Sequence, residues 1–254
     1  MFNGVRIIIP SYKRPNTIRT KTLAALKSYN VPPGCITVFV ADTDEERVYR
    51  NALTAEDCGD IIVGCPGLAE VRNYILSYYP RGAKIVMIDD DVQGFVQRTE
   101  TGGVQRLQCL GTVIQRGFQE AETAGCTLWG VAPVPNGFFL RDTVTTDLKF
   151  CIGSFWGIVN PGSGPDGIHL PMSDKEDYIR TLLAFKRDGK VVRMNYVSVK
   201  SAYYTEPGGM QTDPQRLAKQ EEAVRYLLET FPGMVRRNTR RKSHYPEVLL
   251  KRLR

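Results

Sequence analysis

The chain has 254 residues, of which 42% are hydrophobic and 24% are charged. This length and composition exclude a disordered chain, a collagen-like fibre and a disulfide-stapled miniprotein, and they indicate one large or two small domains. The formal net charge is +7, which for the chain as a whole would indicate a binder of nucleic acid or of an anionic surface.

The charge is not evenly distributed. Residues 236–254 hold 8 basic side chains and one acidic side chain, whereas residues 1–235 hold 26 of each. We therefore predict a neutral domain over residues 1–235 and a basic extension over residues 236–254 that packs on or near the functional site.

The six cysteines and two histidines form no CxxC pair and no zinc-ligand spacing. We expect reduced thiols in a cytosolic protein. The apolar run before Pro10 is too short for a signal sequence, and no stretch of about 20 apolar residues occurs. These features predict a cytoplasmic protein with no membrane partner.

The elements follow one another in an alternating order. A continuous apolar run at residues 5–9 is typical of a strand buried on both faces. Asn16 and Thr17 suit the cap of a helix that would run to residue 29. Further strands are predicted at 36–40, 60–63, 84–88, 127–132, 150–159 and 191–199, and further helices at 42–51, 68–79, 108–124, 174–186 and 214–231. This order predicts a single α/β domain with a doubly wound, mostly parallel sheet and helices on both faces.

Three consecutive carboxylates, Asp89, Asp90 and Asp91, follow the predicted strand at 84–88. Like charges repel one another unless a cation or hydrogen-bond donors compensate them, and carboxylate oxygens suit Mg²⁺ or Mn²⁺. In open α/β sheets, ligands bind at the carboxyl ends of the strands. The triplet therefore predicts a metal site, and the alternative is a solvated acidic turn.

Polar side chains also follow the other predicted strands. They comprise Pro10, Ser11, Tyr12 and Arg14 after the first strand, Asp42 after the second, and Arg72 on the helix after the third. Each of these residues alone is weak evidence for a binding site, because turns commonly contain polar residues. Together, an aromatic ring, an acid, cations and a carboxylate triplet at one edge predict a site for a nucleoside diphosphate with a divalent metal.

Five strings, in their order and spacing, resemble the GT-A fold of nucleotide-sugar glycosyltransferases: IIIPSYKRPNTI, VADTD, GLAEVRNYIL, VMIDDDV and KEDYIRTLLAFKRDGKVVRMNYVSV. The resemblance covers most of residues 5–200. It implies that Asp89 and Asp91 surround a Mn²⁺ or Mg²⁺ ion and the ribose or diphosphate of a UDP-sugar, with Asp90 adjacent. It also implies that Asp42 contacts uracil.

The same resemblance implies that the pair Glu176 and Asp177 supplies the general base of an inverting transfer, with Asp177 as the first candidate. In a retaining enzyme Asp177 would instead support the sugar or the leaving group. The alternative is that both acids only stabilise the first turn of a helix.

Within this class, PSYKRP, MIDDDV and YTEPGG are similar to the phage TET/JBP-associated glycosyltransferases. This likeness implies transfer of a sugar to a 5-hydroxymethylpyrimidine, most simply 5-hydroxymethylcytosine, in DNA, in the host cytoplasm if the chain is phage-encoded. Two alternatives stay open. One is a glycan, protein or small-molecule acceptor, and the other is an inactive domain that only binds DNA.

Several further residues are candidates for the metal and acceptor sites. His244 is a possible third metal ligand, or simply part of the basic extension. Trp156 would stack on the sugar or on a flipped base, unless it is a core aromatic. Glycine-containing segments at 99–106 and 203–211 are candidate lids. The remaining acceptor candidates are Tyr204 and the basic side chains Arg236, Arg237, Arg240, Arg241 and Lys242, which would contact DNA phosphates unless the terminus is frayed. The apolar residues near 245–253 suit a short terminal helix.

Overall fold

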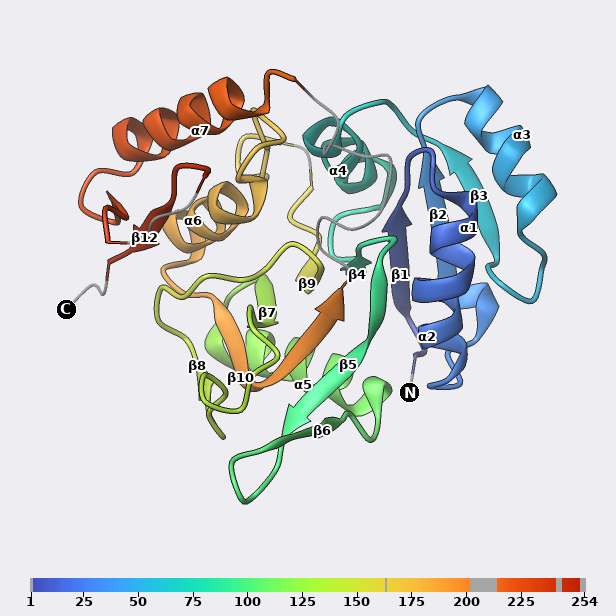
Figure 1. Cartoon of the computed structure of the whole chain (residues 1–254), viewed down its shortest axis with the longest axis horizontal. Coiled ribbons are helices and arrows are strands. Elements are labelled where there is room, and N and C mark those ends of the chain that lie inside the picture. The colour runs from blue at the N-terminus through green and yellow to red at the C-terminus, as the bar shows by residue number, and fades with distance from the viewer. Residues whose placement is uncertain (1, 163, 202–213, 241–243, 252–254) are drawn as a thin grey trace.

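The computed structural model describes residues 2–162, 164–201, 214–240 and 244–251. Ten strands form one sheet in the order β3-β2-β1-β4-β9-β7-β10-β5-β6, with β8 paired to β10 (Figure 1). The α/β fold class expected from the sequence is therefore confirmed.

Four parallel strands make up the N-terminal half of the sheet. They are β1 (Val5–Pro10), β2 (Ile36–Val40), β3 (Asp60–Val63) and β4 (Lys84–Ile88), and all four lie where the sequence predicts them. Their connections hold α3 (Thr43–Ala52) and α4 (Leu68–Tyr78). Because the strands are parallel, their carboxyl ends lie along one edge of the sheet.

The first helix is continuous but changes its winding. It consists of α1 (Pro15–Ile18), a π-helical turn at Arg19–Leu23 and α2 (Ala24–Lys27). It begins at Pro15, whose fixed φ suits the first helical position. The expectation that Asn16 or Thr17 caps this helix is wrong, because both lie inside it and the cap residue makes no side-chain hydrogen bond.

The second half of the sheet contains antiparallel strands that the sequence did not indicate. The antiparallel strand β9 (Phe155–Val159) lies between β4 and β7 (Leu128–Ala132). Strand β10 (Val192–Ser201) pairs in parallel with β7 and antiparallel with both β8 (Val144–Thr145) and β5 (Val92–Arg98). Helices α5 (Leu110–Ala124) and α6 (Glu176–Asp188) lie within two residues of their predicted ranges.

The candidate lid at 99–106 belongs to a hairpin. It forms the turn of a hairpin between β5 and β6 (Val104–Arg106), closed by a hydrogen bond from the Thr99 N–H to the Gly103 carbonyl (2.9 Å). Strand β5 starts beside the acidic triplet and carries this turn away from it (Figure 1). The other candidate lid, 203–211, lies outside the described residues.

The C-terminal part is a hairpin rather than a short helix. Strands β11 (Val235–Arg237) and β12 (Val248–Leu250) pair antiparallel. Val235 and Val248 are buried in a cluster with Leu227 of α7 (Arg216–Thr230) and Leu182 of α6. This apolar contact keeps the segment against the domain, and the predicted boundary at residue 235 falls within β11.

The two faces of the sheet bury alternate residues of each strand. Ile7 and Ile9 pack on the face that carries α2 and α3, whereas Ile8 and Phe39 pack on the face that carries α4. All four side chains are completely buried, as the two-residue period of a strand requires. This double burial explains why the N-terminal strands are continuous apolar runs.

All six cysteines are free, as expected. No helix in the described ranges combines the length and the apolar composition needed to cross a bilayer.

Trp129 on β7 is completely buried between two glycines, Gly117 of α5 and Gly157 of β9. We expect Gly157→Ala to destabilise the fold by about 1–3 kcal/mol, because the added Cβ would overlap the indole ring. Thermal unfolding measures this loss. Gly94→Ala on β5 is the matched control, since its Cβ would meet no atom within 4 Å, and an equal loss in both variants would contradict the prediction.

Candidate active site

The acidic triplet lies in the tight connection between β4 and β5, at the carboxyl edge of the sheet. Its backbone is held on two sides. The Asp89 N–H donates to the Ser154 carbonyl (3.2 Å), next to β9. Thr22 Oγ1 donates to the Asp89 carbonyl (2.8 Å) and accepts from the Val92 N–H (2.9 Å). The completely buried Thr22 therefore fixes both ends of the triplet to the first helix.

Asp90 points towards the loop that follows β1. One of its oxygens accepts from Ser11 Oγ (2.7 Å) and the other from Arg14 Nη1 (3.0 Å). Burial raises the pKa of Asp90, and Arg14 opposes that rise. The structure thus brings the predicted residues Ser11, Arg14 and Asp90 together, with the Asp90 carboxylate engaged by the protein itself.

Tyr49 of α3 completes this group of side chains. Its hydroxyl is 2.6 Å from Ser11 Oγ and accepts from the Arg14 N–H (3.0 Å). The ring is completely buried, and burial raises the pKa of Tyr49 to about 12. The phenol therefore stays protonated and joins α3 to the loop after β1.

Asp89 is the carboxylate of the triplet that reaches solvent. Its side chain is 34% exposed, and one oxygen accepts from Arg72 Nη2 (2.9 Å), whose own side chain is 2% exposed. Loss of solvation raises the pKa of Asp89 to about 6. The positive charge of Arg72 opposes this rise, and the negative charges of Asp91 and Asp90 increase it. A second positive charge near Asp89 would therefore be favourable.

The triplet fits a divalent cation in one respect and not in another. Asp91 is buried beside Asp89, and Mg²⁺ in nucleotide sites commonly takes one or two carboxylates and completes its shell with phosphate oxygens and water. However, the described residues contain no group of three His, Cys, Asp or Glu side chains that could hold a metal. The predicted set of Asp89, Asp91 and His244 is thus not assembled as a ready-made cluster.

The start of α6 meets the triplet at Arg72. Glu176 is buried, pairs with Arg72 and accepts from Arg180 Nη1 (2.7 Å). Asp177 is half-buried, and its Oδ1 accepts from the Tyr178 N–H (2.9 Å). A Cβ added at Gly153 would lie 2.8 Å from Glu176 Oε1 and 3.6 Å from the Asp177 Cβ. Both predicted acids therefore lie beside the Asp89–Arg72 pair.

Trp156 is not available for stacking on a base or sugar. Its side chain is 1% exposed and belongs to a core cluster with Ile8 and Met87. The indole Nε1 donates to the Gly153 carbonyl (3.0 Å). The prediction of an acceptor role is wrong, because a strand that is buried on both faces leaves no side open. Large exposed aromatic side chains lie elsewhere, at Phe138 (74%) and Phe139 (59%).

The remaining nucleotide candidates lie after β1 and β2. Pro10 is the buried last residue of β1, and Tyr12 is 40% exposed with the Lys13 ammonium 4.9 Å from its ring centre. Asp42 is exposed and caps α3 by accepting from the Glu45 N–H (2.9 Å). Because the Lys13 N–H donates to Glu45 (2.8 Å), the two loops are neighbours.

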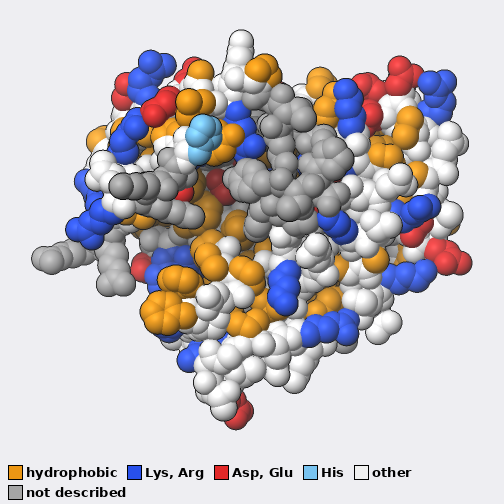
Figure 2. Space-filling view, in the orientation of Figure 1, with side chains coloured by type: hydrophobic (Ala, Val, Ile, Leu, Met, Phe, Trp, Pro, Cys, Tyr) orange, Lys and Arg blue, Asp and Glu red, His pale blue; other side chains and the backbone are white. Residues whose placement is uncertain are grey.

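The basic side chains in the described part of the extension are exposed. Arg236 and Arg240 are exposed, and Arg237 makes two bonds to Glu221 of α7 (3.2 and 2.5 Å). His244 is exposed, and its ring packs against Tyr245 (4.9 Å between centroids). Figure 2 shows Lys and Arg side chains interspersed with acids over α7. Tyr204, Arg241 and Lys242 lie outside the described residues.

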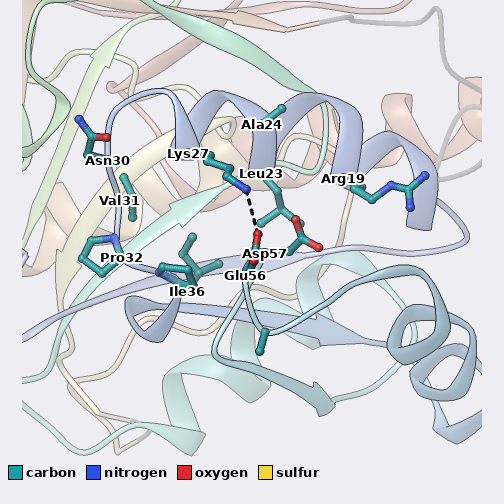
Figure 3. Close-up of a pocket in the computed structure, with 12 residues that line it drawn as sticks. Arg19, Leu23, Ala24, Lys27, Asn30, Val31, Pro32, Ile36, Glu56 and Asp57 are labelled. Atoms are coloured by element: carbon teal, nitrogen blue, oxygen red, sulfur yellow. Dashed lines mark hydrogen bonds and ion pairs between the residues drawn. The ribbon is translucent and has the colours of Figure 1, made fainter.

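The hollow shown in Figure 3 lies at the opposite edge of the sheet. Its apolar lining includes Leu23 of the first helix and Ile36 at the start of β2, and an ion pair between Lys27 and Glu56 (3.4 Å) spans it. Since β2 begins here, this hollow is remote from the carboxyl edge and from the acidic triplet.

No protein-family model and no curated protein matches the sequence. The fold is similar to S. aureus TarS, with a TM-score of 0.50 and 14% identity over 88% of this chain and 39% of that one. The M. tuberculosis glucosyl-3-phosphoglycerate synthase, solved with Mn²⁺, UDP-glucose and phosphoglyceric acid, has a TM-score of 0.45 and 13% identity over 92% of this chain and 83% of that one. The fold is GT-A-like. At these identities the likeness shows the fold alone, and the chain spans about two-fifths of the length of TarS.

The sequence did not single out Thr22 and Tyr49, although they hold the site together. The signal in the sequence was a hydroxyl-bearing side chain at a position where the amphipathic pattern of its helix predicts burial. A helical pattern reports which face is buried but not which distant backbone group a hydroxyl will meet.

We expect Thr22→Val to lower the free energy of unfolding by about 1–3 kcal/mol, because the Asp89 carbonyl and the Val92 N–H lose their common partner in the interior. Chemical denaturation measures the change. Thr20→Val is the matched control, since the Thr20 hydroxyl bonds to the Asn16 carbonyl on the exposed side of the same helix (2.8 Å). Equal losses in the two variants would contradict the assigned role of Thr22.

Proposed function

We propose that this chain is a metal-dependent glycosyltransferase that uses a UDP-sugar as donor. One observation carries the proposal: in a GT-A-like fold, Asp89 at the carboxyl edge pairs with the buried Arg72, and the charge of Asp177, at the start of α6, acts on the same arginine. Such a transfer requires one carboxylate that binds the cation and a second carboxylate that takes the proton of the acceptor hydroxyl.

In the proposed reaction, Asp89 and Asp91 are the residues that would hold Mn²⁺ or Mg²⁺, and the cation would supply positive charge to offset the negative charge of the departing UDP. Tyr12 and Asp42 line the place of the uracil ring, and Arg14 fixes Asp90 beside it. For an inverting transfer, Asp177 takes the proton of the acceptor hydroxyl. The acceptor oxygen then bonds to the anomeric carbon while the bond from that carbon to UDP breaks.

We expect Asp89→Ala to abolish Mn²⁺-dependent UDP binding in calorimetry. Asp177→Asn should keep UDP binding but slow sugar transfer by about 10²-fold or more, because the proton acceptor is lost. Glu56→Gln, at the remote edge and 83% exposed, is the control and should match the wild type. A wild-type protein that neither binds UDP with Mn²⁺ nor transfers sugar from any UDP-sugar would contradict the proposal.

We further propose DNA carrying a 5-hydroxymethylpyrimidine as the acceptor. The support is the charge of the extension, net +7 over residues 236–254, and its place in the fold. Val235 and Val248 of the hairpin share one apolar cluster with Ile179 of α6, the helix that begins at Glu176 and carries Asp177. Arg236, in β11, and Arg240, just after it, are exposed and suit phosphate contacts.

The acceptor is tested with hydroxymethylated DNA and a panel of UDP-sugars, with nucleosides identified by mass spectrometry. We expect Arg236→Gln with Arg240→Gln to weaken DNA binding and to reduce the slope of log affinity against log salt by about 2. Arg47→Gln, exposed on α3, is the control. UDP-sugar hydrolysis without DNA should not change.

Transfer to glycans or small molecules but not to DNA would contradict the proposed DNA acceptor and would support the proposed glycosyltransferase activity. DNA binding that survives in a protein unable to bind UDP would instead indicate a binding module.

A further inference from the structure

The Asp89–Arg72 pair belongs to a network of four charged side chains: Asp89, Arg72, Glu176 and Arg180. We infer that Glu176 is a positioning residue that holds Arg72 against Asp89, and that it takes no proton from the acceptor. This inference rests on the proposed function and divides the roles of the two neighbouring acids, Glu176 and Asp177.

Both oxygens of the Glu176 carboxylate already contact arginines, and the side chain is almost completely buried. Oε1 pairs with Arg72 Nη1, and Oε2 accepts from Arg180 Nη1 (2.7 Å). The Glu176 side chain is 6% exposed. A general base must come within hydrogen-bond reach of the proton that it removes, and a carboxylate enclosed by two guanidinium groups does not meet that requirement.

Arg180 is itself anchored to the core. Its Nη2 donates to the Cys151 carbonyl (2.9 Å), and its guanidinium lies 3.9 Å from the ring centre of Trp156. The Trp156 indole in turn bonds to the Gly153 carbonyl, which also accepts from Arg72 Nη2 (3.2 Å). Glu176 therefore connects a rigid part of the core to the arginine that contacts Asp89.

The charges of the network balance only when Glu176 is present. Arg72 and Arg180 are both almost completely buried, and two carboxylates, Asp89 and Glu176, offset their two positive charges. Burial lowers the pKa of each arginine to about 10, so both stay charged at neutral pH. Without Glu176, Asp89 would be the only carboxylate left within the network, and Arg72 would lose the partner of its Nη1.

Asp177 has the features that Glu176 lacks. It is half-buried rather than enclosed, and its Oδ1 accepts from the N–H of the next residue in the first turn of α6. Its charge acts on Arg72 and Arg180 from outside the network. The neighbouring acids therefore differ in role because only Glu176 is paired with both arginines.

The test separates binding from chemistry in Glu176→Gln and Asp177→Asn. We expect Glu176→Gln to raise the Kd for UDP with Mn²⁺ and the KM for the donor by about 10-fold or more. The kcat at saturating donor should change much less, and the acid limb of the pH profile should be retained. Asp177→Asn should show the reverse pattern. If Glu176→Gln instead lowers kcat by 10²-fold or more at an unchanged Kd and loses the acid limb, Glu176 is the base and the inference is overturned.

Glu46→Gln is the matched control. It breaks an ion pair of the same i,i+4 spacing, with Arg50 on the surface of α3 (2.7 Å), and we expect an unchanged Kd. If Glu176→Gln fails to fold, Arg180→Lys provides a second variant. It keeps the charge but removes the forked contact, and it should raise the Kd with little change in kcat, whereas an unchanged Kd overturns the inference.

A wild-type protein that binds no UDP would contradict the proposed function but would not test the role of Glu176 in the network. In that case the inference is decided by thermal unfolding of Glu176→Gln, Arg72→Gln and the double variant. We expect the double variant to lose much less stability than the two single losses combined, because each single change strands the other charge. Additive losses would overturn the inference.

Discussion

The burial of Arg72 is the constraint on which the rest of the site depends. A guanidinium with 2% of its side chain exposed needs carboxylates close by, because an unpaired buried charge costs several kcal/mol. Asp89 and Glu176 meet that need from two distant parts of the chain. The same contacts bring the end of β4 and the start of α6 to one point, so the packing of this arginine also assembles the candidate active site.

The second group of polar contacts acts on the backbone and the neighbouring loop. Thr22 holds both ends of the triplet, and Ser11, Arg14 and Tyr49 hold Asp90. The Asp90 carboxylate is therefore committed to protein partners, while a third of the Asp89 side chain remains open to solvent. The three neighbouring carboxylates therefore differ in surroundings, and Asp89 is the most exposed of them.

The structure also shows where the basic extension, residues 236–254, attaches to the domain. The basic extension is attached to the domain at two places, because β11 and β12 pair with each other and pack through Val235 and Val248 onto α7 and α6. Arg237 is neutralised locally by Glu221, whereas Arg236 and Arg240 stay exposed. The exposed guanidinium groups of Arg236 and Arg240 therefore lie in and directly after β11.

Much of this arrangement was readable from the sequence. Continuous apolar runs that stop at Pro10 or at Asp89 predicted the parallel strands and their common carboxyl edge, because a strand buried on both faces leaves no other pattern. The same reasoning placed Ser11, Arg14, Arg72 and the triplet at one edge. Local patterns of this kind depend only on neighbouring residues, and the structure confirms where they lie in the fold.

The tertiary structure decided what those residues do to one another. The antiparallel direction of β9 buried Trp156 and brought Gly153 beneath Arg72, and the strand's own residues carry no signal for that direction. The two oxygens of Glu176 met arginines from α4 and from its own helix, which separated it from Asp177 although the two are adjacent in sequence. The sequence by itself determined the fold class and the edge at which the polar residues collect. Which carboxylate is paired, which is open and which aromatic is buried followed only from contacts between distant segments, because pairing depends on distances that no local pattern contains.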